Sequence, residues 1–182
     1  MNQRPTTNDQ RPNIVLIGFM GSGKTVVGKN LSSILSRPFI DTDSLIEQRQ
    51  AKTITEIFDQ DSEAGFRKLE ALMVAEVTGK KNQVISVGAG AVLDPKNADN
   101  LKKSGILIYL KTDFSTTYDR IKASKNRPLL AASGSRDDMQ ALFESRRITY
   151  ESISDYIVGT MNKSPKEVAE EIIEELRSDG KI

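Results

Sequence analysis

Gly18-Phe-Met-Gly-Ser-Gly-Lys24-Thr25 directly follows the apolar run Ile14–Ile17 and has the spacing of a phosphate-binding P-loop. In such a loop the glycines let backbone N–H groups curl round the phosphates, the lysine reaches the β and γ phosphates, and the threonine hydroxyl can ligate Mg²⁺. The helix expected after the loop adds its positive N-terminal end. The sequence therefore predicts a nucleoside triphosphate site made by Gly21, Ser22, Gly23, Lys24 and Thr25.

Composition limits the kinds of chemistry and partner. The chain has 182 residues, 37% of them hydrophobic, which suits one well-packed domain. With 26 Lys and Arg against 25 Asp and Glu, the net charge of +1 gives no broad field to attract nucleic acid or an anionic membrane, so small-molecule partners are favoured. The absence of cysteine and histidine excludes thiol nucleophiles, Cys/His zinc sites and histidine bases. Proton transfer must then use carboxylates, lysine, tyrosine or water.

The N-terminal stretch does not have the pattern of a secretory signal. Residues 1–12 are polar and lack the apolar core of a secretory signal, so we expect a disordered tail before a single domain over residues 13–182. No apolar run approaches the length of a membrane span. A nucleotide-binding loop needs ATP or GTP, which favours the cytoplasm.

Short apolar runs alternate with longer stretches of helical pattern, which predicts an α/β fold of three layers, with a five-stranded parallel sheet flanked by helices. The expected strands are Ile14–Ile17, Pro38–Ile40, Val84–Val87, Gly105–Leu110 and Tyr156–Val158. The first helix should span Lys24 to about Ser36, with its inner side formed by Val27, Leu31, Ile34 and Leu35. A capping box at Ser164–Glu167 predicts a last helix that buries Val168, Ile172, Ile173 and Leu176.

One long polar stretch separates two helical patterns. Residues 123–135 include Lys125-Asn-Arg-Pro128 and Ser133-Gly-Ser135. A polar loop of this length in a compact domain is often an active-site lid. We therefore predict a mobile lid here.

Two carboxylates follow the second strand, at Asp41-Thr-Asp43. The carboxyl ends of parallel strands meet at one edge of the sheet, so these acids should lie beside the phosphate loop. There they could orient an acceptor hydroxyl or hold a metal in phosphoryl transfer. They could equally cap a helix, since Asp43 precedes a helical pattern and Ser44–Glu47 has capping-box spacing. The spacing alone leaves both interpretations open.

Several arginines are candidates for binding anions, because a guanidinium can hold a carboxylate or phosphate with two hydrogen bonds. Each of them, taken alone, also fits a solvated surface residue. They are Arg67, Arg120, Arg127, Arg146 and Arg147.

Taken together, the motifs resemble those of the shikimate kinase family. The resemblance covers most of the chain in the family's order and rests on GFMGSGKT (18–25), FIDTDSLIE (39–47), ITEIF (54–58), EAGFRKLE (63–70), VGAGAVL (87–93), RPLL (127–130) and the spacing from Arg146 to Tyr150. It implies a P-loop kinase that uses ATP and Mg²⁺ to phosphorylate the 3-hydroxyl of shikimate, and we expect a monomer.

The resemblance also implies roles for single residues. Asp43 matches the acid that binds and orients the acceptor hydroxyl, and Asp41 matches the residue that holds Mg²⁺ together with Thr25. Arg67 and Arg146 match the arginines that hold the substrate carboxylate.

The remaining roles concern the loop after the third strand and the nucleotide. Backbone N–H groups of Gly88, Ala89 and Gly90 are expected beside the substrate carboxylate. Arg127 matches the family's lid arginine, which moves onto the transferring phosphate, and we expect Lys24 to act on the same phosphate as a second catalytic residue. Arg120 matches an arginine near adenine.

Two positions depart from the family pattern. Ala89 stands where the family usually has the second of three glycines, and we expect its backbone to have φ < 0 with its methyl group pointing away from the substrate. Ser62 stands where glycine is common, and we interpret it as an N-cap that starts a helix.

Other nucleotide-binding classes fit less well. Another small-molecule P-loop kinase, for gluconate or a nucleoside monophosphate, would share the loop and sheet. The gluconate kinases carry a histidine that this chain lacks, and no Asp-Gly-Phe-Pro segment typical of adenylate kinases occurs. A regulatory GTPase needs Asp-x-x-Gly and Asn-Lys-x-Asp, which are also absent. A catalytically dead scaffold is disfavoured because Lys24, Thr25, Asp41 and Asp43 are all present.

Overall fold

The structure is a computed structural model that describes residues 10–123 and 135–182. Most of the predicted tail and nearly all of the predicted lid, including Arg127 and the RPLL segment, lie outside the described residues. At the start of the described part, the Arg11 carbonyl accepts a hydrogen bond from Asn82 N–H and the Pro12 carbonyl accepts one from Arg37. Both residues are thus hydrogen-bonded to the domain.

The five predicted strands form one parallel sheet in the order β2-β3-β1-β4-β5. The strands are β1 Asn13–Ile17, β2 Phe39–Asp41, β3 Val84–Ser86, β4 Gly105–Lys111 and β5 Tyr156–Gly159. The predicted α/β fold is confirmed. Each strand boundary lies within one residue of the predicted one.

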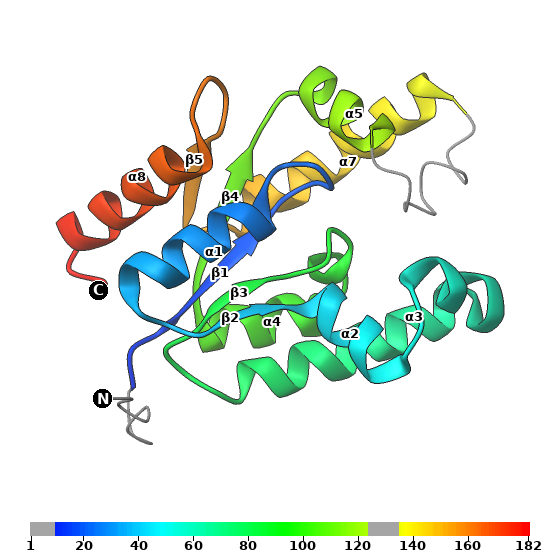
Figure 1. The fold of residues 1–182 in the computed structure, drawn as a ribbon, viewed down its shortest axis with the longest axis horizontal. Coiled ribbons are helices and arrows are strands. Elements are labelled where there is room, and N and C mark those ends of the chain that lie inside the picture. The colour runs from blue at the N-terminus through cyan, green and yellow to red at the C-terminus, as the bar shows by residue number, and fades with distance from the viewer. Residues whose placement is uncertain (1–9, 124–134) are drawn as a thin grey trace.

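Helices cover both faces of this sheet (Figure 1). They are α1 Lys24–Leu35, α2 Thr42–Gln50, α3 Ile54–Thr78, η1 Ala91–Leu93, α4 Pro95–Ser104, α5 Phe114–Lys122, α7 Arg136–Ile153 and α8 Pro165–Ser178. Along β1, Ile14 and Leu16 pack with α1 and α8, whereas Val15 and Ile17 pack with α3, α4 and α7. This alternation explains why the central strand β1 is apolar at every position from Ile14 to Ile17.

The two helices predicted in detail agree largely with the structure. In α8, the capping box at Ser164 is present and all four predicted inward residues are buried. In α1, Val27 and Leu31 are buried and Leu35 packs partly against the same core, but Ile34 is 43% exposed. The helical stripe that contacts the sheet is therefore narrower than predicted. Among the described residues, none of the helices combines the length and apolar composition that a membrane span requires.

The parallel sheet brings three loops to one edge. β1 leads into the P-loop, β2 ends at Asp41, and β3 leads into Gly88–Gly90. Asp41 pairs in register with Ser86, which in turn pairs with Leu16, so the three strand ends lie side by side. This is the edge at which open α/β sheets bind their ligands.

Ser62 corrects one prediction. It lies at the kink inside α3 where one helical segment ends and the next begins, so a helix does start after it, but its φ of 64° and ψ of 171° are not those of an N-cap, which has negative φ. Almost only glycine adopts this backbone region without strain, and other residues pay about 1–3 kcal/mol there. Ser62 is therefore a strained site in the helix that carries Arg67.

We expect Ser62→Gly to stabilise the protein by about 1 kcal/mol, since the strain relieved exceeds the extra chain entropy of glycine in the unfolded state. For a domain of this size, that gain should raise Tm by about 2–4 °C in a thermal melt. Ser62→Ala is the matched control, because it removes the hydroxyl but keeps the Cβ atom. Equal Tm values for the two variants would show that backbone strain is not the cause.

Candidate functional site

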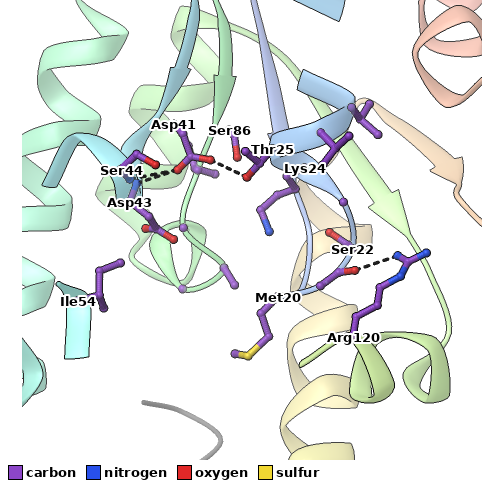
Figure 2. Close-up of a pocket in the computed structure, with 18 of the residues that line it drawn as sticks. Met20, Ser22, Lys24, Thr25, Asp41, Asp43, Ser44, Ile54, Ser86 and Arg120 are labelled. Atoms are coloured by element: carbon purple, nitrogen blue, oxygen red, sulfur yellow. Dashed lines mark hydrogen bonds between the residues drawn. The ribbon is translucent and has the colours of Figure 1, made fainter. Parts of the chain in front are cut away.

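A cavity of about 730 Å³ opens at the carboxyl edge of the sheet. The P-loop and α1 form one wall, and α2, α3 and the Gly88–Gly90 loop form the other. Figure 2 shows Lys24 and Asp43 facing the space between these walls. Of the predicted phosphate-binding and acceptor-binding residues that the structure describes, all line this cavity except Arg146.

The P-loop leaves the start of α1 open. Its N-cap, Gly23, has φ 94° and no side chain to cap the helix. Every other α-helix in the described part of the chain has a side-chain cap. Uncapped N–H groups at a helix N-terminus favour a bound anion. The Lys24 ammonium donates to the carbonyls of Gly18 and Phe19, at 2.8 and 3.1 Å, which holds it across the loop.

Asp41 connects the two walls and also caps α2. Its Oδ2 accepts a hydrogen bond from the Thr25 hydroxyl at 2.8 Å, while its Oδ1 accepts from the N–H groups of Asp43 and Ser44 (Figure 2). The capping interpretation therefore holds for Asp41 and not for Asp43, and a chemical role for either acid stays a prediction. Asp41 is the cap, whereas Asp43 lies inside the first turn of α2 and Ser44 follows it, so the capping box suggested at Ser44–Glu47 is not formed.

No cluster of three or more acidic, histidine or cysteine side chains that could enclose a metal occurs among the described residues. Mg²⁺ in phosphotransfer enzymes is usually held by one or two protein groups plus water and substrate phosphates. A pair such as Thr25 and Asp41, hydrogen-bonded to each other beside the P-loop, fits that requirement.

Asp43 faces the Gly88–Gly90 loop. Its Oδ1 is buried, and a Cβ atom added to Gly88 would lie 2.6 Å from it and 2.7 Å from Glu70 Oε1. The two carboxylates therefore approach Gly88 so closely that a side chain at this position must displace them. The backbone of Gly88 does not have a positive φ, so glycine is required at this position because the two carboxylates lie so close to it.

The Gly88–Gly90 loop differs in one respect from what we expected. The Gly88 N–H donates to the buried Thr42 hydroxyl at 3.1 Å, so it is already used within the protein. This leaves the Ala89 and Gly90 N–H groups as the donors for a substrate. The φ of Ala89 is not positive, as predicted, so its methyl group causes no backbone strain. The direction of that methyl group stays a prediction.

Arg67 lies on the same wall as the Gly88–Gly90 loop, across the cavity from the P-loop. It is close to Gly90, since a Cβ atom added to Gly90 would lie 2.3 Å from the Arg67 guanidinium. It donates to Glu70 at 2.8 Å and to Glu63 at 3.0 Å. Burial alone would lower the pKa of Arg67, but the charge of Glu70 and the hydrogen bonds to both acids outweigh it, so that the pKa is raised. Arg67 is thus held as a cation facing the cavity.

Glu70 was not predicted as a site residue. It is 1% exposed, and burial raises its pKa although the nearby Arg67 and Arg146 oppose the rise. Its spacing of three residues from Arg67 on a helix was the signal that could have identified it. Its Oε1 atom makes no hydrogen bond to the described residues.

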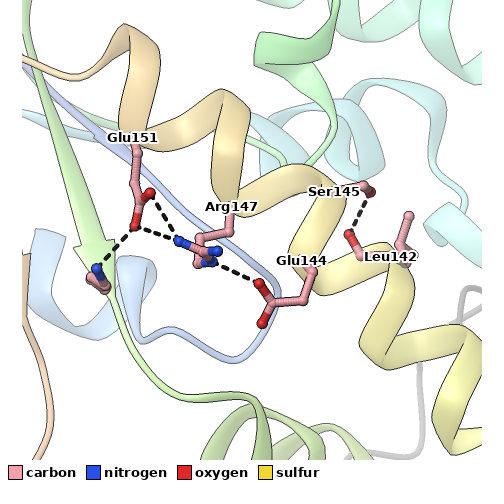
Figure 3. A network of polar contacts seen from close by, with 6 residues as sticks. Leu142, Glu144, Ser145, Arg147 and Glu151 are labelled. Atoms are coloured by element: carbon pink, nitrogen blue, oxygen red, sulfur yellow. Dashed lines mark hydrogen bonds and ion pairs between the residues drawn. The ribbon is translucent and has the colours of Figure 1, made fainter.

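The adjacent Arg146 and Arg147 have different environments, and neither of them lines the cavity. Arg147 binds Glu144 and Glu151 at the surface, and Glu151 also binds Lys111 (Figure 3). Arg146 is 5% exposed and lies over the Phe19 ring, behind the cavity wall. Its Nε and one terminal nitrogen have no hydrogen-bond partner among the described residues. Buried guanidinium nitrogens without partners are costly unless an anion joins them.

The far end of the cavity lies beyond the P-loop. Arg120 donates to the Gly21 carbonyl at 3.0 Å and lines this end (Figure 2), while its place near adenine stays a prediction. The connection from β5 to α8 also contributes lining residues that the sequence analysis did not predict as part of the site, namely Thr160, Lys163 and Pro165. The signal that could have identified them is the rule that the carboxyl ends of parallel strands meet at one edge, because β5 was a predicted strand of this sheet.

Comparison with known proteins identifies the family. The model of the family described as shikimate kinase matches residues 20–177. The chain belongs to the shikimate kinase family. A shikimate kinase from Pelotomaculum thermopropionicum is 44% identical over 170 residues, which cover 93% of this chain and 98% of that protein.

Solved structures agree with this assignment. The shikimate kinase from Acinetobacter baumannii, determined in complex with shikimate, has a TM-score of 0.89 at 35% identity, covering 93% of this chain and 94% of that one. A gluconokinase from Sinorhizobium meliloti has a TM-score of 0.58 at only 14% identity. The second likeness shows a shared fold alone, so the fold does not distinguish shikimate kinases from gluconate kinases.

Proposed function

We propose that this shikimate kinase transfers the γ-phosphoryl group of ATP to the 3-hydroxyl of shikimate, yielding ADP and shikimate 3-phosphate. The observation that carries the proposal is the single cavity with a P-loop on one wall and Asp43 and Arg67 on the other. Family membership supports the same reaction.

The acceptor side of the cavity is suited to a hydroxylated carboxylic acid. Arg67 binds the carboxylate at the cavity wall, with Arg146 behind it and the Ala89 and Gly90 N–H groups beside it. Asp43 then orients the 3-hydroxyl and accepts its proton as the new O–P bond forms. A positioned carboxylate of this kind is the usual acid–base group in phosphoryl transfer.

The donor side binds ATP. Lys24 and the uncapped start of α1 hold the phosphates, with Arg120 near the adenine. Thr25 and Asp41 hold Mg²⁺, which when bound neutralises charge on the β and γ phosphates. Arg127 lies outside the described residues, and its contact with the transferring phosphate stays a prediction. We also propose that the protein is a monomer, and the need for ATP favours the cytoplasm.

The substrate can be tested by measuring ADP release with Mg-ATP and a panel of shikimate, gluconate and nucleoside monophosphates. We expect turnover with shikimate alone. Turnover with gluconate or a nucleotide at a comparable rate would contradict the proposal, because neither the pair of arginines nor Asp43 would then define the acceptor.

Arg67→Ala should raise the KM for shikimate roughly tenfold, through loss of one charge-assisted hydrogen bond that is partly exposed to solvent. Steady-state kinetics with either substrate varied would measure this. Arg49→Ala is the matched control, since Arg49 is a neighbouring arginine whose ion pair with Glu76 lies at the surface, away from the cavity. A change in the KM for ATP, with the KM for shikimate unaltered, would refute the assignment of Arg67.

A further inference from the structure

Tyr150 makes a polar contact with the Gly88–Gly90 loop that the reaction described above does not use. The residue lies on α7 and is 1% exposed. Its hydroxyl donates a hydrogen bond of 2.6 Å to the Ala89 carbonyl, across 61 residues of sequence. Burial raises the pKa of Tyr150, so the phenol keeps its proton and remains a donor.

This hydrogen bond fixes one peptide plane. The Ala89 carbonyl and the Gly90 N–H belong to the same planar trans peptide, in which the two groups point in opposite directions. A carbonyl held toward α7 therefore turns the Gly90 N–H away from α7. The Gly88 N–H is bound to Thr42, so the loop is held at two points, and Ala89 and Gly90 line the cavity between them.

The same phenol is linked to Arg146. Arg146 and Tyr150 are one helical turn apart on α7, and the charge and hydrogen bonding of Arg146 oppose the rise in the Tyr150 pKa. The Tyr150 ring is held in turn by Tyr109, at a centroid distance of 5.3 Å. One buried side chain thus contacts both the carboxylate-binding arginine and the loop that supplies N–H donors.

We infer that Tyr150 is a positioning residue that aligns the Gly90 N–H and Arg146 for the carboxylate of the substrate. The inference rests on the proposed function, because it assumes that a carboxylate occupies this corner of the cavity. It predicts that losing the hydroxyl weakens binding of the acceptor specifically. A residue that only stabilised the fold would weaken binding of both substrates or lower Tm without changing affinity.

The test is Tyr150→Phe, with Tyr109→Phe as the matched control. Tyr109 belongs to the same ring pair, but the hydrogen bond to the Ala89 carbonyl comes from Tyr150, so this variant removes an equivalent hydroxyl without releasing the loop. We expect the Kd for shikimate, measured by calorimetry, to rise by about 3- to 10-fold in Tyr150→Phe, as for loss of one buried hydrogen bond. The Kd for ATP should not change in either variant.

A carboxylate-free analogue makes the test sharper. With shikimate whose carboxylate is replaced by a hydroxymethyl group, the difference between wild type and Tyr150→Phe should disappear. An equal loss of affinity for shikimate and for ATP, or an undiminished loss with the analogue, would overturn the inference. Unchanged shikimate binding in Tyr150→Phe would also overturn it, whereas failure of the wild type to bind shikimate would instead refute the proposed function.

Discussion

Replacing Asp43 by asparagine should lower kcat by about 100- to 10,000-fold, the usual contribution of a positioned acid–base group. Asparagine has almost the same shape and still fits beside Gly88, but it cannot accept the proton of the acceptor hydroxyl. The P-loop lies on the opposite wall, so the Kd for Mg-ATP should not change. Measuring kcat by coupled ADP release and ATP affinity by calorimetry separates the two effects.

Asp59→Asn is the matched control for this prediction. It makes the same change of charge on α3, at an exposed residue that does not line the cavity. Its kcat should equal that of the wild type. Near wild-type turnover in Asp43→Asn would show that another group receives the proton. A parallel loss of ATP affinity would instead indicate that Asp43 organises the nucleotide side.

The sequence predicted the centre of the sheet well because β1, β3 and β4 are almost fully buried and have a strong local signal. A strand buried on both faces is continuously apolar, and the P-loop glycines indicate where the first strand ends. The parallel topology then places Asp41 and Asp43 beside Lys24 without any further information. These parts of the site depend on local pattern and on one general rule of architecture.

Other features depend on contacts between distant segments, which a local pattern cannot reveal. Nothing in the sequence indicates that the Thr42 hydroxyl accepts a hydrogen bond from the Gly88 N–H, or that the Tyr150 hydroxyl donates one to the Ala89 carbonyl. Ser62 was misjudged for a different reason. Serine is a favourable N-cap in most contexts, but the kink in α3 imposes a backbone conformation that overrides this preference.

The second large effect is expected for Gly88→Ala, which should reduce kcat/KM for shikimate by about 100-fold, as displacements near 1 Å do in active sites. The added methyl group would lie 2.6 Å from Asp43 Oδ1 and 2.7 Å from Glu70 Oε1, so both carboxylates must shift. Both atoms are ends of side chains and can move without disturbing the backbone. We therefore expect little change in Tm.

The next residue supplies the control for Gly88→Ala. Ala89→Gly removes one methyl group from the same loop, whereas Gly88→Ala adds one. The φ of Ala89 is already compatible with alanine, so the removal relieves no backbone strain. Because no carboxylate is displaced, its KM for shikimate should stay close to that of the wild type. A much lower KM in Ala89→Gly would show that the alanine methyl obstructs the substrate. Full activity in Gly88→Ala would mean that Asp43 can leave its place beside Gly88 without cost, which is incompatible with its role in orienting the acceptor hydroxyl.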